Sequence, residues 1–173
     1  MYDATNNGVI MERKSFTAMD CSVAQSLEVV GEWWSMLIVR DAFLGVTRFE
    51  HFQRRLGISR NILRDRLNAL VEHEVLVRAP YSERPPRYDY RLTDKGRDLW
   101  PVLTALRQWG DRWAAPEGPP VVMVHTDCGE VANAVMVCAH CGEALTDRDV
   151  RVRAGQGRPE LDVERRVPEK VNR

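Results

Sequence analysis

The sequence predicts a mainly α-helical domain with one small β-hairpin, an α+β fold, followed by a small C-terminal segment with paired cysteine and histidine residues. Three observations lead to this prediction. Apolar residues recur at helical spacing in several segments between residues 20 and 113. Two runs of β-branched and aromatic residues, 75–78 and 88–92, flank a proline-rich stretch. Two short Cys/His motifs follow within residues 125–141.

The composition is that of a chain able to bury a core. Of its 173 residues, 44% are hydrophobic and 29% are charged. No segment approaches the roughly 20 apolar residues that a membrane helix needs, and the N-terminus has no apolar signal segment. We therefore expect a cytoplasmic protein, in which four cysteines indicate metal or thiol chemistry rather than structural disulfides.

The charge of the chain is unevenly distributed. The formal net charge is zero, which taken alone argues against nucleic-acid binding. Residues 48–97, however, hold 12 Lys and Arg against 7 Asp and Glu, and the rest of the chain carries the balancing negative charge. A local basic region is what phosphate binding needs. A solvated charged surface would have the same composition, so charge alone does not decide between the two.

The first half of the domain is predicted to contain four helices. The first two cover about Ser22–Val30 and Trp33–Leu44, and each is followed by a glycine that can end it. A short amphipathic helix is expected over Arg48–Leu56, ending at Gly57. The fourth, Ser59–Glu74, begins at a serine that is a good N-cap.

The fourth helix has two distinct faces. At about 100° per residue, Leu63, Leu67 and Leu70 share one side of it. Ile58, just before it, is expected to point inward. The opposite side holds the polar residues Asn61, Arg64, Asp65 and Asn68. The leucines are therefore predicted to lie in the core and the polar residues at the surface.

A hairpin and a long helix are predicted to complete the domain. The strands are Val75–Arg78 and Tyr88–Leu92, and the residues between them, Ala79–Arg87, are expected to form a proline-rich loop. The last helix is predicted over about Lys95–Trp113. Pro101 would lie inside this helix and is expected to kink it.

This order of elements is that of a winged helix-turn-helix, in which the fourth helix enters the major groove and the hairpin reaches the DNA backbone. The predicted DNA contacts are Arg48, Ser59, Arg60, Asn61, Arg64, Asn68, Arg84 and Arg87. Arginine can bond guanine edges bidentately and asparagine adenine edges. Asp65 argues against DNA unless it pairs with a neighbouring arginine or accepts from cytosine. The competing interpretation is an ordinary solvated helix face.

A set of short motifs resembles the HxlR-type family of winged-helix regulators. These motifs are Cys21-Ser22-Val23, Gly31-x-x-Trp34, Arg48-Phe49, Gly57-Ile58-Ser59, the three leucines, Pro86-Arg87-Tyr88-Asp89-Tyr90, Leu92-Thr93-x-x-Gly96 and Trp109-Gly110. Trp33 stands where the family usually has a lysine. The resemblance implies a homodimer, with the first and last helices in the subunit contact, that binds double-stranded DNA at an inverted-repeat operator.

The C-terminal motifs predict a metal site. His125-x-x-Cys128 and Cys138-x-x-Cys141 are each followed by glycine and are separated by nine residues. Four such donors suit a closed, tetrahedral, structural zinc site, a zinc-ribbon-like arrangement whose metal would supply folding energy. The alternatives are a redox disulfide between Cys138 and Cys141, or free thiols with His125 uninvolved. His140 is a weaker ligand candidate.

Cys21 is the candidate sensor residue. It lies at the predicted start of the first helix, where the helix dipole favours a thiolate. The family resemblance adds that some members sense oxidants or electrophiles with a cysteine at the matching place. The equally supported alternative is a packing cysteine at the dimer interface. A switch at this position would need an intermolecular disulfide or an adduct.

Four tryptophans offer a second candidate site for a signal. Trp33, Trp34, Trp109 and Trp113 could line a pocket for a small aromatic effector. We favour the simpler interpretation that they lie in the core and the dimer contact, which large aromatic side chains commonly dominate.

The function expected is that of a dimeric transcriptional regulator, a repressor, that responds to a redox or electrophilic signal or to an aromatic effector. One alternative is a protein-interaction module that uses the zinc ribbon. A thiol- or metal-dependent enzyme is disfavoured, because four protein ligands leave zinc no open position. The expected domains are a flexible arm (1–19), the winged helix-turn-helix (20–115), the Cys/His segment (120–150) and a disordered tail (151–173).

Overall fold

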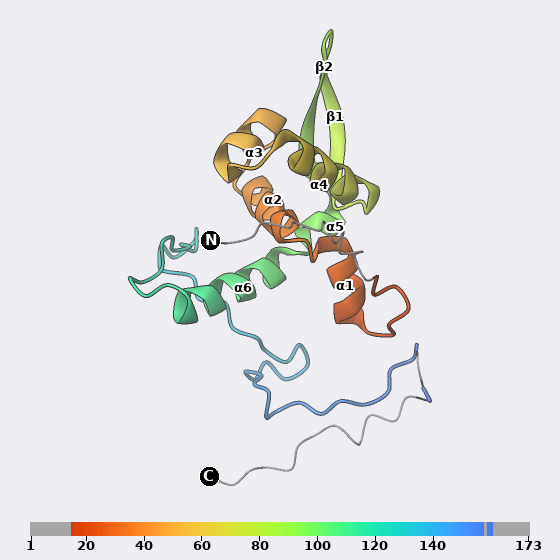
Figure 1. Cartoon of the computed structure of the whole chain (residues 1–173). Helices are drawn as coiled ribbons and strands as arrows, with labels where there is room; N and C mark the ends of the chain where they lie inside the picture. The colour runs from red at the N-terminus through yellow and green to blue at the C-terminus, as the bar shows by residue number, and fades with distance from the viewer. Residues whose placement is uncertain (1–14, 158, 161–173) are drawn as a thin grey trace, which may run out of the picture. The chain divides into compact units, whose positions relative to one another are not determined.

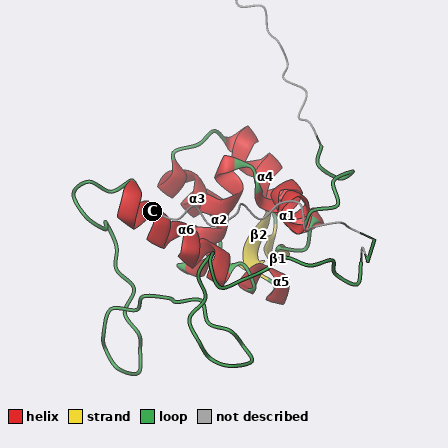
Figure 2. Cartoon of the chain, turned by 90° about the horizontal axis from the view of Figure 1, so that it is seen from below, coloured by secondary structure: helices red, strands yellow, loops and turns green. Residues whose placement is uncertain are grey.

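The computed structural model describes residues 15–157, 159 and 160, and it confirms the mainly helical fold with one small hairpin (Figure 1). The chain divides into two units, residues 1–114 and 115–173. All helices and strands of the described residues lie in the first unit, as their colours in Figure 2 show. Their order is α1 (Ser22–Val30), α2 (Trp33–Phe43), α3 (Phe49–Leu56), α4 (Arg60–Glu72), β1 (Leu76–Glu83), β2 (Pro86–Leu92), α5 (Asp94–Arg97) and α6 (Trp100–Trp113).

Two local interactions fix the turn between α3 and α4. Gly57 ends α3 with a φ of 66°, a left-handed conformation that glycine adopts without the steric cost of a side chain. Its N–H donates to the Gln53 carbonyl at 2.9 Å. The Ser59 hydroxyl then accepts a hydrogen bond from the Ile62 N–H at 3.3 Å and caps α4. These two caps produce the predicted helix-turn-helix.

The apolar face of α4 lies at the centre of the core. Leu63, Leu67 and Leu70 are completely buried, as predicted. The same cluster includes Ile38 and Val39 of α2, Phe52 of α3, Ile58 of the turn, and Val75 and Leu76 at the start of the hairpin. Burial of one such side chain stabilises the fold by about 1.5–3 kcal/mol, so the cluster fixes how α4 is rotated about its own axis.

The hairpin is longer than predicted. Only residues 84 and 85 separate β1 from β2, so the predicted loop Ala79–Arg87 is wrong over most of its length. Pro80 lies opposite Tyr88, and the register shifts between Pro80 and Ser82. Each strand of a two-stranded sheet has one unpaired edge, so a proline that faces outward costs no hydrogen bond between the strands. The long hairpin projects beyond α4 as the wing of the fold (Figure 1).

The single last helix predicted over Lys95–Trp113 is in fact two helices, α5 and α6. Pro101 lies in the first turn of α6, where its missing N–H has no intrahelical partner to lose, so it begins a helix and does not kink one. The Thr93 hydroxyl caps α5 by accepting from the Gly96 N–H at 3.0 Å. Gly96 lies so close to the Val75 carbonyl that a Cβ would approach its oxygen to 2.2 Å. Only glycine therefore fits where α5 contacts the start of the hairpin.

The residues before α1 are held by one glutamine. The Gln25 side chain donates to the carbonyls of Phe16, Thr17 and Met19 at 2.8–3.3 Å. Residues 1–14 of the predicted arm, and residues 158 and 161–173 of the predicted tail, lie outside the described residues. No helix in the described part of the chain is long and apolar enough to cross a membrane.

Among the described residues of the first unit, Asp41 is a completely buried carboxylate. Asp41 of α2 accepts two hydrogen bonds from Arg55 of α3, from Nε at 3.1 Å and from Nη2 at 3.3 Å. Arg40 approaches the same carboxylate at 2.9 Å. The hydrogen bond to Asp41 raises the pKa of Arg55. Because a buried carboxylate is tolerated only when it is paired, this contact joins α2 to α3.

Replacement of Arg55 by alanine is expected to lower the urea midpoint of unfolding without changing the slope of the transition. The change leaves the Asp41 carboxylate buried with Arg40 as its remaining basic partner, which destabilises the folded state. Arg54→Ala is the matched control, because Arg54 is the preceding residue of α3 and its side chain is exposed. Equal midpoints for the two variants would show that the buried ion pair does not stabilise the fold.

Candidate nucleic-acid interface

The exposed face of α4 carries the predicted recognition residues. Arg60, Asn61, Arg64 and Asn68 are all exposed. Asn61, Arg64 and Asn68 lie away from the buried leucines, whereas Arg60, in the first turn, lies on the side of α4 that faces α3. Ser59, also predicted as a contact, is exposed and uses its hydroxyl to cap α4. The structure therefore brings together five of the predicted DNA contacts on one helix and its N-cap.

Asp65 does not leave an unpaired negative charge on this face. Its carboxylate accepts from the Nε of Arg64 at 3.3 Å, and both side chains remain more than half exposed. Arg60 lies over the ring of Phe49 at 5.0 Å and donates to Gln53 at 3.5 Å. Both contacts connect the first turn of α4 to α3, which positions the guanidinium of Arg60 at the junction of the two helices.

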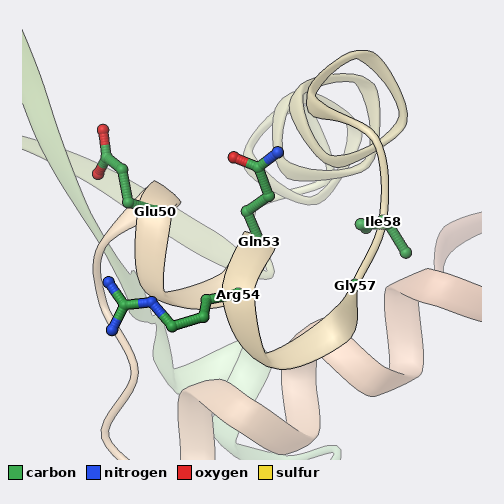
Figure 3. A pocket seen from close by; sticks show the side chains of 5 residues that line it. All are labelled: Glu50, Gln53, Arg54, Gly57 and Ile58. Atoms are coloured by element: carbon green, nitrogen blue, oxygen red, sulfur yellow. The ribbon is translucent and has the colours of Figure 1, made fainter.

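A shallow hollow lies beside the turn between α3 and α4 (Figure 3). Its lining residues are Glu50, Gln53, Arg54, Gly57 and Ile58. Figure 3 shows the first three projecting from α3, with Ile58 on the other side of the turn. Gln53 and Arg54 are not among the DNA contacts predicted from the sequence, although both lie within about one helical turn of Gly57.

Arg48 attaches the wing to α3. It is the N-cap residue of α3, and its guanidinium lies 4.7 Å from the centre of the Tyr81 ring in β1. Its backbone forms an isolated bridge with Asp89 of β2, and the two side chains approach to 3.8 Å. The adjacent Thr47 carbonyl accepts from the Tyr90 N–H at 2.7 Å. The predicted contact residue Arg48 thus lies where the base of the wing meets α3.

Asp89 has a structural role in the wing that was not predicted from the sequence. Its carboxylate accepts from Arg91 at 3.1 Å and from the Thr47 hydroxyl at 3.2 Å. The hydrogen bond from Arg91, helped by Thr47 and by the positive charges of Arg91 and Arg48, lowers the pKa of Asp89 against the opposing effect of its burial. A carboxylate so paired stays ionised at neutral pH and holds basic side chains at the base of the wing.

The end of the wing carries two exposed arginines. Arg84 lies in the two-residue turn and Arg87 follows in β2. The Ser82 hydroxyl donates to the Pro85 carbonyl across this turn at 3.0 Å. Further along the same hairpin, Arg78 lies over the ring of Tyr88 at 4.5 Å. The wing therefore presents positive charge at its tip, as phosphate contact requires.

Cys21 lies at the N-cap of α1. Its side chain is exposed and does not bond the helix terminus. Its N–H donates to the Met19 carbonyl at 2.8 Å, and its own carbonyl accepts from the Gln25 N–H at 2.9 Å. The backbone of this residue is fixed at both ends, while its thiol is accessible.

Three of the four tryptophans lie at the surface of the single chain. Trp33, Trp109 and Trp113 are 88%, 61% and 65% exposed, whereas Trp34 is partly buried against the core. The hollows at the α3–α4 turn and beside Phe43 are lined by none of them. The exposure of Trp109 and Trp113 follows from the position of α6, of which only Thr104 is buried.

The four predicted metal ligands lie in the second unit as two pairs. The Nδ1 of His125 is 3.3 Å from the Cys128 sulfur. The amides of Cys141 and His140 donate to the Cys138 sulfur, which lowers the pKa of that thiol, and the Cys141 thiol contributes in the same direction. No group of three or more metal-binding side chains is assembled among the described residues. The structure thus brings the predicted ligands together within each pair only.

Comparison with known proteins assigns the family. Residues 29–118 match the family described as HxlR-like helix-turn-helix. This chain belongs to that family. An HTH-type transcriptional regulator of Mycobacterium tuberculosis is 49% identical over 137 residues, which are 79% of this chain and 87% of that protein. The chain is a transcriptional regulator of the helix-turn-helix type, a DNA-binding class and not an enzyme class.

Two solved structures are similar to this HxlR-like chain. PA1607, a candidate transcription factor, is 47% identical with a TM-score of 0.74, and the match covers 82% of this chain and 100% of that one. The redox regulator HypR in its reduced form is 28% identical with a TM-score of 0.52, covering 55% and 95%. The mycobacterial match is longer than the first unit, so that similarity extends into the second unit.

Proposed function

We propose that this HxlR-like protein is a repressor that binds an inverted-repeat operator as a homodimer. In this proposal α4 enters the major groove and the wing contacts the adjacent backbone. The observation that carries it is the exposed set Asn61, Arg64 and Asn68 on α4, away from a completely buried leucine face. A dimer bound across an operator would exclude other proteins from that stretch of DNA.

The side chains of α4 suit direct recognition of bases. Arginine matches the O6 and N7 acceptors of guanine, and asparagine matches N6 and N7 of adenine. Arg64 and Asn68 are four residues apart on one helix, so their side chains lie next to each other on the same face. Asn61 lies one turn before Arg64. We infer that these three read base edges.

Phosphate contacts are proposed for the residues around this face. Arg48 precedes α3 and Arg60 begins α4, and each guanidinium lies over an aromatic ring, that of Tyr81 and that of Phe49 respectively. The serine cap leaves the start of α4 directed outward, where backbone N–H groups favour an anion. Arg84 and Arg87 would reach the backbone from the tip of the wing. Such contacts orient the protein without reading sequence.

The apolar surface of α1 and α6 supports the proposed homodimer. On α6 the exposed apolar residues are Trp100, Val102, Leu106, Trp109 and Trp113, and on α1 they are Val23 and Leu27. An exposed apolar surface of this kind marks an interaction site in a folded protein. Association of two copies through these helices would cover it and would hold two α4 helices for two half-sites.

The proposed signal is thiol chemistry at Cys21. This thiol is exposed at the N-cap of α1, one of the two helices of the proposed dimer contact. An adduct or a disulfide between subunits at this position would change how the two copies meet. The similarity to a protein described as a redox regulator favours this over an aromatic effector.

Arg64→Ala is expected to weaken binding to a selected operator roughly 5- to 150-fold, because one bidentate base contact contributes about 1–3 kcal/mol of discrimination. Binding to unrelated duplex should weaken much less. Fluorescence anisotropy with both duplexes at one salt concentration measures the two effects, and Arg97→Ala on α5 is the control. An equal loss on both duplexes would reassign Arg64 to a phosphate contact. Failure to select any duplex would favour a protein-interaction module.

Trp109→Glu is expected to convert the dimer to monomers at micromolar concentration. A carboxylate without a partner is costly to bury in an apolar contact, and operator affinity should fall because the two half-sites are no longer bound together. Sedimentation velocity measures the change. Val135→Glu, which alters a residue 75% exposed outside α1 and α6, is the control. A Trp109→Glu protein that remains dimeric would exclude α6 from the interface.

The wild-type protein is expected to lose operator binding after treatment with peroxide or a quinone. Cys21→Ser is expected to bind the operator as the wild type does in reducing buffer and to keep that binding after the treatment. The substitution removes the proposed sensor sulfur while keeping a small polar residue at the N-cap. Ser22→Ala, the next residue of the helix, should keep the wild-type response. A response that persists in Cys21→Ser, measured by anisotropy before and after oxidation, would place the sensor elsewhere.

A further inference from the structure

We propose that the second unit binds one zinc ion through His125, Cys128, Cys138 and Cys141, and that this ion joins two turns of equal construction. The first turn covers residues 123–132 and the second residues 136–145. The proposal concerns this unit alone and does not depend on what the first unit binds.

The two turns have the same hydrogen bonds, thirteen residues apart. The His125 N–H donates to the Glu130 carbonyl at 2.9 Å, and the Cys138 N–H donates to the Glu143 carbonyl at 2.8 Å. The remaining equivalent bonds are Gly129 N–H to His125 O at 2.9 Å, Gly142 N–H to Cys138 O at 2.8 Å, Ala132 N–H to Met123 O and Leu145 N–H to Met136 O, both at 2.8 Å. An isolated bridge closes each turn, Val124 with Val131 and Val137 with Ala144. The four proposed ligands occupy equivalent places in this repeat.

A glycine of the same conformation follows the second ligand in each turn. Gly129 has a φ of 75° and Gly142 has a φ of 77°. A residue with a side chain rarely adopts this left-handed conformation. The glycines allow the chain to reverse directly after each second ligand. The first and second ligands of a turn are thereby held on the same side of it.

The distance within the first turn suits tetrahedral zinc. The Nδ1 of His125 lies 3.3 Å from the Cys128 sulfur. A nitrogen and a sulfur bound to one tetrahedral zinc ion are separated by about 3.6 Å, given bond lengths of about 2.1 and 2.3 Å.

The second unit has no hydrophobic core that could hold the two turns. None of its described residues, 115–157, 159 and 160, is buried. Seven of its apolar residues are at least half exposed: Val121, Val122, Val124, Val131, Val135, Met136 and Val137. A segment this small cannot obtain its stability from burial, and a structural metal is the usual substitute. Zinc bound by four protein ligands would supply it and would leave no position for a substrate.

The test uses the full-length protein, reduced, freed of metal and titrated with zinc chloride or cobalt chloride. Native mass spectrometry is expected to show one zinc per chain, and the cobalt form should show the charge-transfer absorption of thiolate ligands. Cys128→Ser and Cys141→Ser should each lower zinc affinity at least 100-fold. His140→Ala is the control, because His140 lies between two ligands and is not one, and it should keep wild-type affinity.

Chelation of the wild-type protein provides a second readout. Removal of zinc is expected to make the segment after residue 115 sensitive to protease, while the circular dichroism of the helices and operator binding remain, since the first unit has its own core. Three results would each overturn the proposal. They are no zinc binding by the reduced protein, zinc retained by both cysteine variants, and a Cys138–Cys141 disulfide in freshly purified protein. Loss of operator binding with zinc binding intact would instead contradict the proposed function of the first unit.

Discussion

Burial of one face of α4 is the constraint on which the rest of the first unit depends. Leu63, Leu67 and Leu70 have no exposed surface and contact side chains from α2, α3 and the hairpin. Rotation of α4 about its axis would expose these side chains at a cost of about 1.5–3 kcal/mol each. The helix therefore has one stable orientation. The same packing that stabilises the domain directs Arg64 and Asn68 outward.

The wing is attached to this core through a second, polar set of contacts. Thr47 and Arg48 lie between α2 and α3 in the sequence and contact Asp89 and Tyr90 of β2. Near the end of α3, Arg55 donates to Asp41 of α2. α3 is thus held at its start by the wing and near its end by α2. The pairing of Asp41 with Arg55 and of Thr47 with Asp89 thus positions α3 and the wing through residues that are not themselves proposed DNA contacts.

The two units are stabilised by different physical means. The first buries a cluster of aliphatic and aromatic side chains, whereas the second has no buried residue in its described part. Hydrogen bonds across short exposed turns contribute little net stability, because water competes for the same groups. The regular geometry of the two turns at His125 and Cys138 therefore calls for another source of free energy. The first unit is therefore expected to stay folded when the proposed zinc ion is removed from the second.

The sequence by itself determined the first four helices, the helix-turn-helix and the orientation of α4, because periodic apolar spacing and cap residues such as Ser59 act locally. It also paired the ligands within each Cys/His motif. Only the tertiary structure decided whether Pro80 could lie in a strand, since that depends on which edge of the strand is unpaired. The partnership of Asp41 with Arg55 likewise arises from the packing of α2 on α3, which no local pattern records. Exposure of Trp109 followed from the same cause: helical spacing shows that a face is apolar, but only packing decides what covers it.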